Sequence, residues 1–443
     1  MSGTMTGAGK RVYIKTFGCQ MNEHDSEQML ALLTAHGYHG ATCPEEADVI
    51  LVNTCAVREK PEQKTYSIMG RLHQLKRDNP RAIVGITGCV AEQRGEGLWD
   101  HMPSLDFVLG PGKIHRLPEI LHAVGTGGDG VCATGFEDGP FVHLPLPQSC
   151  RVRTSVTIMQ GCNNFCSYCI VPAVRGRERS RPSKDVLAEI TSLIEQGTKE
   201  ILLLGQNVNA YAKHDSAELT FPELLAKINA IPGIERIRFT TSHPKDLTEE
   251  TIRSFGYLKR LCEHCHLPFQ AGSNAVLERM NRRHTREDYL ALIQRLREVV
   301  PHLSITADVM VGFPGESEED FSQTIELMQV VEFDALFSFK YSPRTGTRAA
   351  QWSDDVAPAA KQSRLERLQA LQREITLKKN RRLAGEIKEV LVEGYSRHVP
   401  NQIMGRTRCN RIVNFVGGRD IMGKVVQVRI TEGLQNSLRG ELC

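Results

Sequence analysis

The 443 residues, of which 40% are hydrophobic and 24% charged, suffice for about two to four globular domains with ordinary cores. A net charge of +3 excludes a polybasic chain, although residues 361–443 hold 17 of the Lys and Arg residues against 8 of the Asp and Glu residues. No apolar run approaches the roughly 18 residues of a membrane helix, and 13 cysteines without a signal peptide argue against a secreted disulfide framework, so we expect a cytoplasmic protein with no membrane partner.

The first segment alternates apolar strands with helical patterns. Strands are predicted at residues 11–18, 48–54 and 82–88, with helices at about 25–36 and 59–76. Strands that are apolar throughout are typical of a parallel sheet covered on both faces. The sequence therefore predicts a doubly wound α/β domain over residues 10–125 and a Gly- and Pro-rich linker over 126–149.

The second segment alternates in the same way for longer. Six strands are predicted, at 155–160, 200–204, 236–241, 263–268, 304–311 and 335–341. Ser183 is a candidate N-cap, and Thr285–Asp288 and Ser317–Asp320 have the form of capping boxes. The pattern indicates a partial or whole α/β barrel, which with a polar helix at 358–383 makes a domain over residues 150–383.

The last segment, residues 384–443, consists of short alternating runs broken by Gly and Asn. This pattern is typical of a small all-β barrel or sandwich. It holds 9 Lys and Arg residues against 6 Asp and Glu residues, so we expect contacts to the phosphates of a polyanion from the cationic residues Arg406, Arg408, Arg411, Lys424 and Arg429.

A cysteine triplet directly follows the first strand of the second domain. Cys162, Cys166 and Cys169 are spaced C-x3-C-x2-C on one polar loop. Three thiolates can hold three irons of a cubane cluster and leave the fourth open to an exogenous ligand. A structural zinc would need a fourth protein ligand.

A second triplet is spread along the first domain. Cys19, Cys55 and Cys89 each follow one of the three predicted strands. The carboxyl ends of neighbouring parallel strands meet at one crevice, so these thiols should converge and again leave one iron open. The alternative is three separate buried cysteines.

Three further patterns are open to two interpretations. Polar loops at the predicted barrel strand ends suggest cofactor contacts from Gln206, Ser242, Gln270 and Gly312, although each loop could be a simple turn. Arg175, Arg177, Arg179 and Arg181 alternate along one face if the run is extended, either as a solvated face or as phosphate contacts. Cys262 and Cys265 resemble half a zinc site, but they lie on a predicted core strand and point to opposite faces.

The C-x3-C-x2-C spacing resembles the signature of radical S-adenosylmethionine (SAM) enzymes, in which the open iron binds the methionine part of SAM. The resemblance implies that Tyr168, just before the last cysteine, lies near the adenine of SAM. The whole chain is similar to the methylthiotransferases, which join a three-cysteine domain, a radical SAM barrel and a C-terminal TRAM β-barrel.

Within that family, KTFGCQMN (15–22) and NTCAVRE (53–59) resemble the branch that acts on N6-dimethylallyladenosine in tRNA. Where this chain has Gln20-Met21, the ribosomal-protein branch tends to have Pro-Lys and the threonylcarbamoyladenosine branch Lys-Val. One departure is Ala173, where relatives often carry Tyr.

The resemblance implies two [4Fe-4S] clusters, one on each triplet, with SAM bound at the cluster on Cys162, Cys166 and Cys169. It implies radical methylthiolation of carbon 2 of the adenosine at position 37 of tRNA, with the sulfur carried by the cluster on Cys19, Cys55 and Cys89. The partners implied are tRNA with dimethylallyl-modified adenosine, an electron donor such as flavodoxin or ferredoxin, and iron–sulfur assembly proteins. The alternatives are methylthiolation of a ribosomal protein or of threonylcarbamoyladenosine in tRNA, and a non-catalytic iron–sulfur RNA-binding redox sensor.

Overall fold

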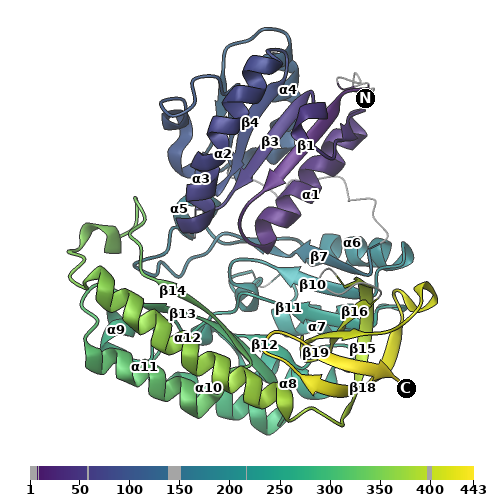
Figure 1. Ribbon diagram of the computed structural model, residues 1–443, viewed down its shortest axis with the longest axis vertical. Helices are drawn as coiled ribbons and strands as arrows, with labels where there is room; N and C mark the ends of the chain where they lie inside the picture. Colours follow the sequence, from purple (N-terminus) through teal and green to yellow (C-terminus); the bar gives the residue numbers. More distant parts are fainter. Residues whose placement is uncertain (1–6, 8, 57–58, 138–150, 216, 397–401) are drawn as a thin grey trace. The chain divides into compact units, whose positions relative to one another are not determined.

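The structure is a computed structural model that describes residues 7, 9–56, 59–137, 151–215, 217–396 and 402–443. The chain forms two compact units (Figure 1). The first comprises Met1–Ser149, Gln160–Asn163 and Cys169–Ser180, and the second Cys150–Met159, Asn164–Tyr168 and Arg181–Cys443. Residues 138–149 of the predicted linker lie outside the described residues.

The first unit is built on a six-stranded parallel sheet in the order β2-β1-β3-β4-β5-β6. Its strands are β1 (Arg11–Thr16), β2 (His39–Gly40), β3 (Val49–Thr54), β4 (Ile83–Gly88), β5 (Phe107–Leu109) and β6 (Val131–Ala133). The three predicted strands are β1, β3 and β4, which lie side by side. The other three are only two or three residues long, too short to show a periodic pattern, and β6 lies in the stretch predicted to be a linker.

Helices cover both faces of this sheet, and every residue of β3 and β4 is therefore buried. The helices of the unit are α1 (Gln20–Ala35), α2 (Glu59–Asp78), α3 (Cys89–Arg94), α4 (Leu117–Gly125) and α5 (Val171–Arg175). One face packs against α1 and α4, and the other against α2, α3 and α5. The sequence prediction started α1 five residues late, since the helix begins directly after Cys19.

The second unit contains six parallel strands that form a partial barrel. They are β7 (Arg153–Thr157), β10 (Glu200–Leu204), β11 (Arg236–Phe239), β12 (His264–His266), β13 (Ser304–Val311) and β14 (Ala335–Lys340). They form two three-stranded sheets joined by a single parallel bridge between Ile237 and Leu261. A short ladder of β8 (Met159–Gln160) and β9 (Arg179–Ser180) follows β7 in sequence. The predicted α/β barrel is confirmed.

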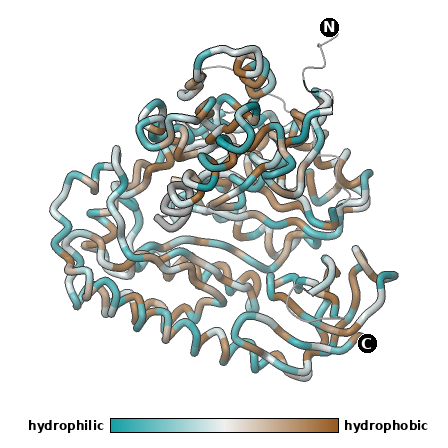
Figure 2. Tube along the Cα trace, turned by 45° about the horizontal axis from the view of Figure 1, so that its top comes forward, coloured by the Kyte–Doolittle hydropathy of each residue, from teal (hydrophilic) through white to brown (hydrophobic). Residues whose placement is uncertain are grey.

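Seven helices follow or separate these strands: α6 (Ser183–Glu195), α7 (Phe221–Asn229), α8 (Glu249–Tyr257), α9 (Asn274–Arg279), α10 (Arg286–Val299), α11 (Glu318–Val331) and α12 (Pro358–Arg381). Hydrophobic and hydrophilic residues alternate along them (Figure 2), as expected of helices with one face on a core. Both predicted capping boxes are confirmed. The prediction for Ser183 is wrong: Pro182 occupies the N-cap, and Ser183 is the first helical residue, with its N–H bonded to Glu218.

The C-terminal residues form a closed five-stranded barrel, as predicted. Its strands are β15 (Ile387–Tyr395), β16 (Ile403–Thr407), β17 (Ile412–Phe415), β18 (Val425–Gly433) and β19 (Leu438–Leu442). Alternate side chains such as Val390, Val413 and Val428 fill its interior. None of the described helices is both long enough and apolar enough to cross a membrane.

Candidate metal and cofactor sites

The N-terminal cysteine triplet meets at one edge of the parallel sheet. Cys19 is the N-cap residue of α1 after β1, Cys55 follows β3, and Cys89 opens α3 after β4. Cys19 forms a hydrogen bond with Cys55 and interacts electrostatically with Cys89. The structure therefore brings the three thiols together, as the positions at strand ends predicted.

Two glycines allow this approach. Gly18 has φ +136°, and a Cβ there would lie 2.5 Å from Cβ of Cys55. Gly88 has φ +88°, and a Cβ there would lie 2.3 Å from Oδ1 of Asn53. A side chain at Gly18 would displace Cys55, and one at Gly88 would displace Asn53 and the backbone of Thr54.

The electrostatics of the triplet favour a thiolate at Cys19. A hydrogen bond with Cys55 lowers the pKa of the Cys19 thiol to about 6, helped by Arg175 and by the backbone N–H groups of Asn22 and Met21, against the raising effect of burial. A thiol at a helix N-terminus near a cation is expected to ionise readily, and iron binds the thiolate. Burial raises the pKa of Cys89, and Arg175 acts against this rise.

Two asparagines that sequence reasoning passed over support the triplet. Nδ2 of Asn22 donates to Oδ1 of Asn53 at 3.1 Å, and Nδ2 of Asn53 donates back to the Asn22 carbonyl at 2.8 Å. Asn22 also accepts the Cys19 thiol at 3.2 Å. Both residues stand within three positions of a predicted ligand, which is the signal that could have identified them.

The arginine run after the second triplet does not form an extended face. Arg175 ends α5 and is buried, with Nη2 2.6 Å from Oδ2 of Asp25 and Nε donating to Sγ of Cys89 at 3.3 Å. Arg181 is buried against Glu189 at 2.6 Å and donates to the Thr157 carbonyl at 2.8 Å. For these two residues, both a solvated face and phosphate contacts are therefore excluded.

The loop of Cys162, Cys166 and Cys169 lies between β8 and α5. Within the second unit, Ser167 bridges two segments, donating its N–H to Met280 at 3.0 Å and accepting from Ala349 at 2.8 Å. Nη1 of Arg282 donates to Sγ of Cys166 at 3.6 Å. Cys166 is buried, and Cys162 and Cys169 are partly exposed.

No group of three Cys, His, Asp or Glu side chains in the described part of the chain has the spacing to hold a single metal ion. Cluster ligands differ from such a group, because each thiolate of a cubane binds a different iron. The thiols of a cluster site therefore need not converge on one point.

The predicted cofactor residues follow four successive strands of the barrel. Gln206 comes after β10, Ser242 after β11, Gln270 after β12 and Gly312 after β13. Ligand sites of α/β barrels lie at these carboxyl ends. Tyr168 packs edge-on against Phe313, with ring centroids 6.3 Å apart.

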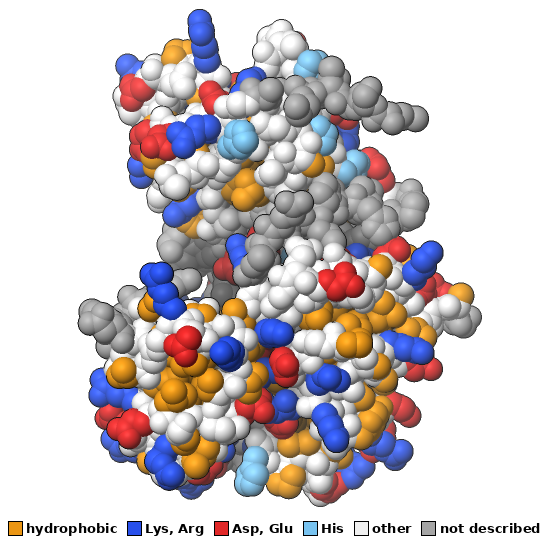
Figure 3. Space-filling view, turned by 90° about the vertical axis from the view of Figure 1, so that its right-hand side faces the viewer, with side chains coloured by type: hydrophobic (Ala, Val, Ile, Leu, Met, Phe, Trp, Pro, Cys, Tyr) orange, Lys and Arg blue, Asp and Glu red, His pale blue; other side chains and the backbone are white. Residues whose placement is uncertain are grey.

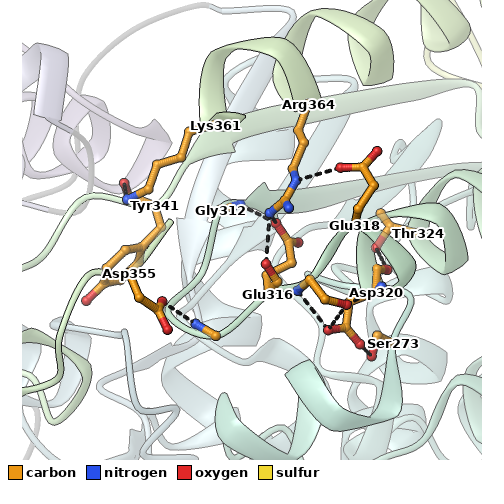
Figure 4. Close-up of polar contacts among 12 residues, drawn as sticks. Ser273, Gly312, Glu316, Glu318, Asp320, Thr324, Tyr341, Asp355, Lys361 and Arg364 are labelled. Atoms are coloured by element: carbon orange, nitrogen blue, oxygen red, sulfur yellow. Dashed lines mark hydrogen bonds and ion pairs between the residues drawn. The ribbon is translucent and has the colours of Figure 1, made fainter. Parts of the chain in front are cut away.

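The loop after β13 is held by a network of its own (Figure 4). The N–H of Gly312 donates to Glu316 at 2.6 Å, and Glu316 is paired with Arg364 of α12 at 2.8 Å. Gly312 has φ +71°, and a Cβ there would lie 2.3 Å from Lys361. Gly312 therefore shapes the loop, and its N–H is already committed to the protein.

Unpaired polar atoms at the end of β11 and on the segment between α9 and α10 suit a polar ligand. Ser242 Oγ and His284 Nε2 are buried and have no hydrogen-bond partner within the described residues. His284 lies edge-on to His243 at 5.8 Å, and burial lowers the pKa of His284 to about 4 and that of His243 further. Both imidazoles are therefore neutral near pH 7. His284 carried no motif and was missed by sequence reasoning.

Cys262 and Cys265 are both buried, but only Cys265 lies on β12 as predicted, and Cys262 precedes that strand. Cys265 lies in the hydrophobic core of the barrel, and burial raises its pKa to about 12. Burial likewise raises the pKa of Cys262 to about 11. The neighbouring His264 and His266 both bond Oγ1 of Thr306, at 3.0 Å each. Cys262 and Cys265 therefore have the surroundings of core side chains.

Three arginines that we expected to contact RNA are instead paired within the protein. Arg408 binds Glu263 of the α/β barrel at 2.7 Å, and Arg411 is paired with Asp334. Arg406 pairs with Glu393 at 2.9 Å. These contacts correct the sequence interpretation, because the guanidiniums already have acidic partners. Lys424 and Arg429 are exposed, and Figure 3 shows cationic and acidic side chains intermixed on its visible face.

Three family models match successive parts of the chain. They are the Uncharacterized protein family UPF0004 over residues 11–110, the Radical SAM superfamily over 156–328 and the TRAM domain over 381–443. Their order agrees with the three folded parts described above.

Two solved structures share the fold at low sequence identity. A radical S-adenosylmethionine methyltransferase, TsrM from Kitasatospora setae, has a TM-score of 0.56 at 14% identity, covering 77% of this chain and 74% of its own. The cobalamin-dependent radical enzyme OxsB has a TM-score of 0.51 at 12% identity, covering 82% of this chain and 56% of its own.

Curated relatives match almost the full length. The tRNA-2-methylthio-N(6)-dimethylallyladenosine synthase of Syntrophus aciditrophicus (strain SB) is 51% identical over 435 residues, covering 98% of this chain and 94% of that protein. The protein of the same name from Geotalea uraniireducens (strain Rf4) is 49% identical over 437 residues, covering 98% and 99%. The chain therefore belongs to the family of tRNA-2-methylthio-N6-dimethylallyladenosine synthases, within the radical SAM methylthiotransferases that its cysteine motifs predicted.

Proposed function

We propose that this enzyme attaches a methylthio group to carbon 2 of N6-dimethylallyladenosine at position 37 of tRNA, giving 2-methylthio-N6-dimethylallyladenosine. The names of its relatives and the radical SAM and TRAM domains support this function. One structural observation carries it: the thiols of Cys19, Cys55 and Cys89 gather at one sheet edge, where a sulfur-bearing cluster could be held.

The radical SAM domain implies SAM and a [4Fe-4S] cluster. When bound, they supply the radical chemistry that acid–base groups cannot apply to an unactivated carbon of adenine. We assign this cluster to Cys162, Cys166 and Cys169 and a second cluster, the sulfur carrier, to Cys19, Cys55 and Cys89.

The SAM site would lie at the strand ends of the barrel. Tyr168, Gln206, Ser242, Gln270 and Gly312 would line it, with Ser242 offering an unpaired hydroxyl. Gly312 would contribute by shaping the loop after β13, because its N–H already donates to Glu316. The neutral His243 and His284 would add polar groups without adding charge.

We divide the work among three domains, with residues 10–125 for sulfur, 150–383 for radical formation and 384–443 for tRNA. The adenosine at position 37 lies in a single-stranded loop, where an unstacked base can enter a pocket. An electron donor such as flavodoxin or ferredoxin, iron–sulfur assembly proteins and a cytoplasmic location complete the proposal.

Mass spectrometry of tRNA nucleosides from cells with and without this protein tests the function. The methylthio nucleoside should disappear in the deletion strain while N6-dimethylallyladenosine accumulates. Loss of methylthiolated threonylcarbamoyladenosine or of a methylthiolated ribosomal protein instead would contradict the substrate. A redox sensor without catalysis would form no 5′-deoxyadenosine from SAM.

Replacing Cys162, Cys166 and Cys169 together by Ala should halve the iron content. Anaerobically reconstituted protein should carry about eight irons, and this variant about four, because only the N-terminal cluster would remain. Formation of 5′-deoxyadenosine should stop. Iron analysis and chromatography of the SAM products check both points, and a variant with full iron would refute the assignment of a cluster to Cys162, Cys166 and Cys169.

The C-terminal barrel should contact RNA through its exposed cations. The double variant Lys424→Glu/Arg429→Glu should bind tRNA more weakly at low salt. The slope of log K against the logarithm of the salt concentration should become shallower by the amount expected for the loss of roughly one to two phosphate contacts. Its melting temperature should not change, because both side chains are exposed. Arg408→Ala is the matched control for the melting measurement. It should lower the melting temperature, because it removes the ion pair with Glu263. Unchanged tRNA affinity in the double variant would exclude this face.

A further inference from the structure

A buried ion pair between Arg175 and Asp25 lies beside the N-terminal cysteine triplet. The side chains of Arg175 and Asp25 are 4% and 2% exposed, and Nη2 lies 2.6 Å from Oδ2. Withdrawing two charges from water costs several kcal/mol per ion, so a buried pair is weak evidence for stability. Its position beside a predicted cluster site suggests a different use.

Arg175 reaches the triplet directly. Its Nε donates to Sγ of Cys89 at 3.3 Å, and its positive charge also acts on Cys19. Nη1 is buried without a partner among the described residues. This unpaired N–H is available to an anionic group held at the triplet.

The fold fixes this guanidinium rigidly. Ile170, the N-cap of α5, and Val174, which precedes Arg175, lie in the same hydrophobic core as Val90 and Ala91 of α3. The helix that begins with Cys89 and the helix that ends with Arg175 therefore pack together. Asp25 of α1 accepts a hydrogen bond from the Arg175 guanidinium.

We infer that Arg175, anchored by Asp25, is a positioning residue for the sulfur-carrying cluster. It donates an N–H to the Cys89 sulfur, and its unpaired Nη1 would be available to a sulfur group carried by the cluster. This inference rests on the proposed function. Three thiolates and an added sulfur give the cluster a negative charge, and N–H bonds to the sulfurs favour its reduced form, so Arg175 should raise its reduction potential.

The experiment uses full-length protein in which Cys162, Cys166 and Cys169 are Ala, so that only the N-terminal cluster is present. Midpoint potentials are measured by redox titration followed by electron paramagnetic resonance, together with iron content. Arg175→Met should shift the potential to a more negative value and Arg175→Lys should restore part of the shift. Asp25→Asn should shift it to a more positive value, because the guanidinium is then uncompensated.

Arg181→Met is the control, since this buried arginine of the same run pairs with Glu189 and should leave the potential unchanged. Equal potentials in Arg175→Met and the parent would overturn the inference, as would shifts of the same sign in Arg175→Met and Asp25→Asn. If Arg175→Met loses its iron, the signs for Arg175→Lys and Asp25→Asn decide. Failure of the proposed function shows separately, as absence of iron in the parent triple variant.

Discussion

Cys55→Ala should abolish methylthiolation of tRNA while SAM cleavage continues. Cys55 lies in the N-terminal triplet, hydrogen-bonded to Cys19, and all three cysteines of the radical triplet stay in place. Iron should fall from about eight to about four per chain. Nucleoside mass spectrometry after an in vitro reaction, with 5′-deoxyadenosine measured in the same samples, reports the two activities separately.

The matched control is Cys43→Ala, the same substitution in the same domain. Cys43 is partly exposed and precedes a short 3-10 helix away from the strand ends that hold the triplet. Iron and product should match the parent. Normal product from the Cys55 variant would refute the sulfur-carrier role, and loss of both product and SAM cleavage would mean that the two clusters are not separable.

The N-terminal triplet was predictable because each cysteine directly follows an apolar strand. Parallel strands bring their carboxyl ends to one edge, so position in sequence translated into position in space. The helix N-termini beside Cys19 and Cys89 were not foreseen, since the α1 pattern became periodic only at Asp25.

The role of Arg175 could not be read from the sequence. Its alternation with three other arginines suggested one shared face if the run were extended, but Pro172 near the start of α5 and Gly176 with φ +78° at its end define a short helix instead. Its partner Asp25 is 150 residues away in the chain. No local pattern encodes a contact of that range.

The C-terminal arginines illustrate the same limit. Charge counts singled out the C-terminal end of the chain, although most of its excess lies on residues 361–383, and they could not show which charges are already paired. Arg408 and Arg411 find acidic partners 145 and 77 residues earlier, on the α/β barrel. A charge count shows that a segment has enough cations to contact phosphates. Only the three-dimensional structure shows which of those cations are exposed.

A separate buried network surrounds Glu200 at the start of β10. Oε1 of Glu200 accepts from Arg238 at 3.0 Å and from Arg153 at 3.1 Å, and its side chain is fully buried. Arg238 also donates to the carbonyls of Thr407 and Arg408 on the C-terminal barrel, at 2.7 Å each. One carboxylate therefore balances cations that join the two barrels.

Glu200→Gln should strongly destabilise the second unit. The substitution preserves shape but leaves buried guanidiniums without a counter-charge, which typically costs about 3–5 kcal/mol. Thermal unfolding followed by circular dichroism should show a large fall in the transition temperature. Glu249→Gln, in exposed ion pairs with Arg253 and Arg295, is the control and should leave the transition unchanged.

The loss should depend on pH with a definite sign. Burial raises the pKa of Glu200, but Arg238, Arg153 and Arg236 outweigh it and hold the pKa below its usual value. A depressed carboxyl pKa stabilises the fold above the unfolded value of about 4.3, and this stabilisation disappears as pH falls through the folded pKa. The gap between parent and Glu200→Gln should therefore be full at pH 7 and shrink below about pH 4, where the parent carboxyl becomes neutral as well. A gap that stayed constant across this range would assign the loss to packing rather than to charge.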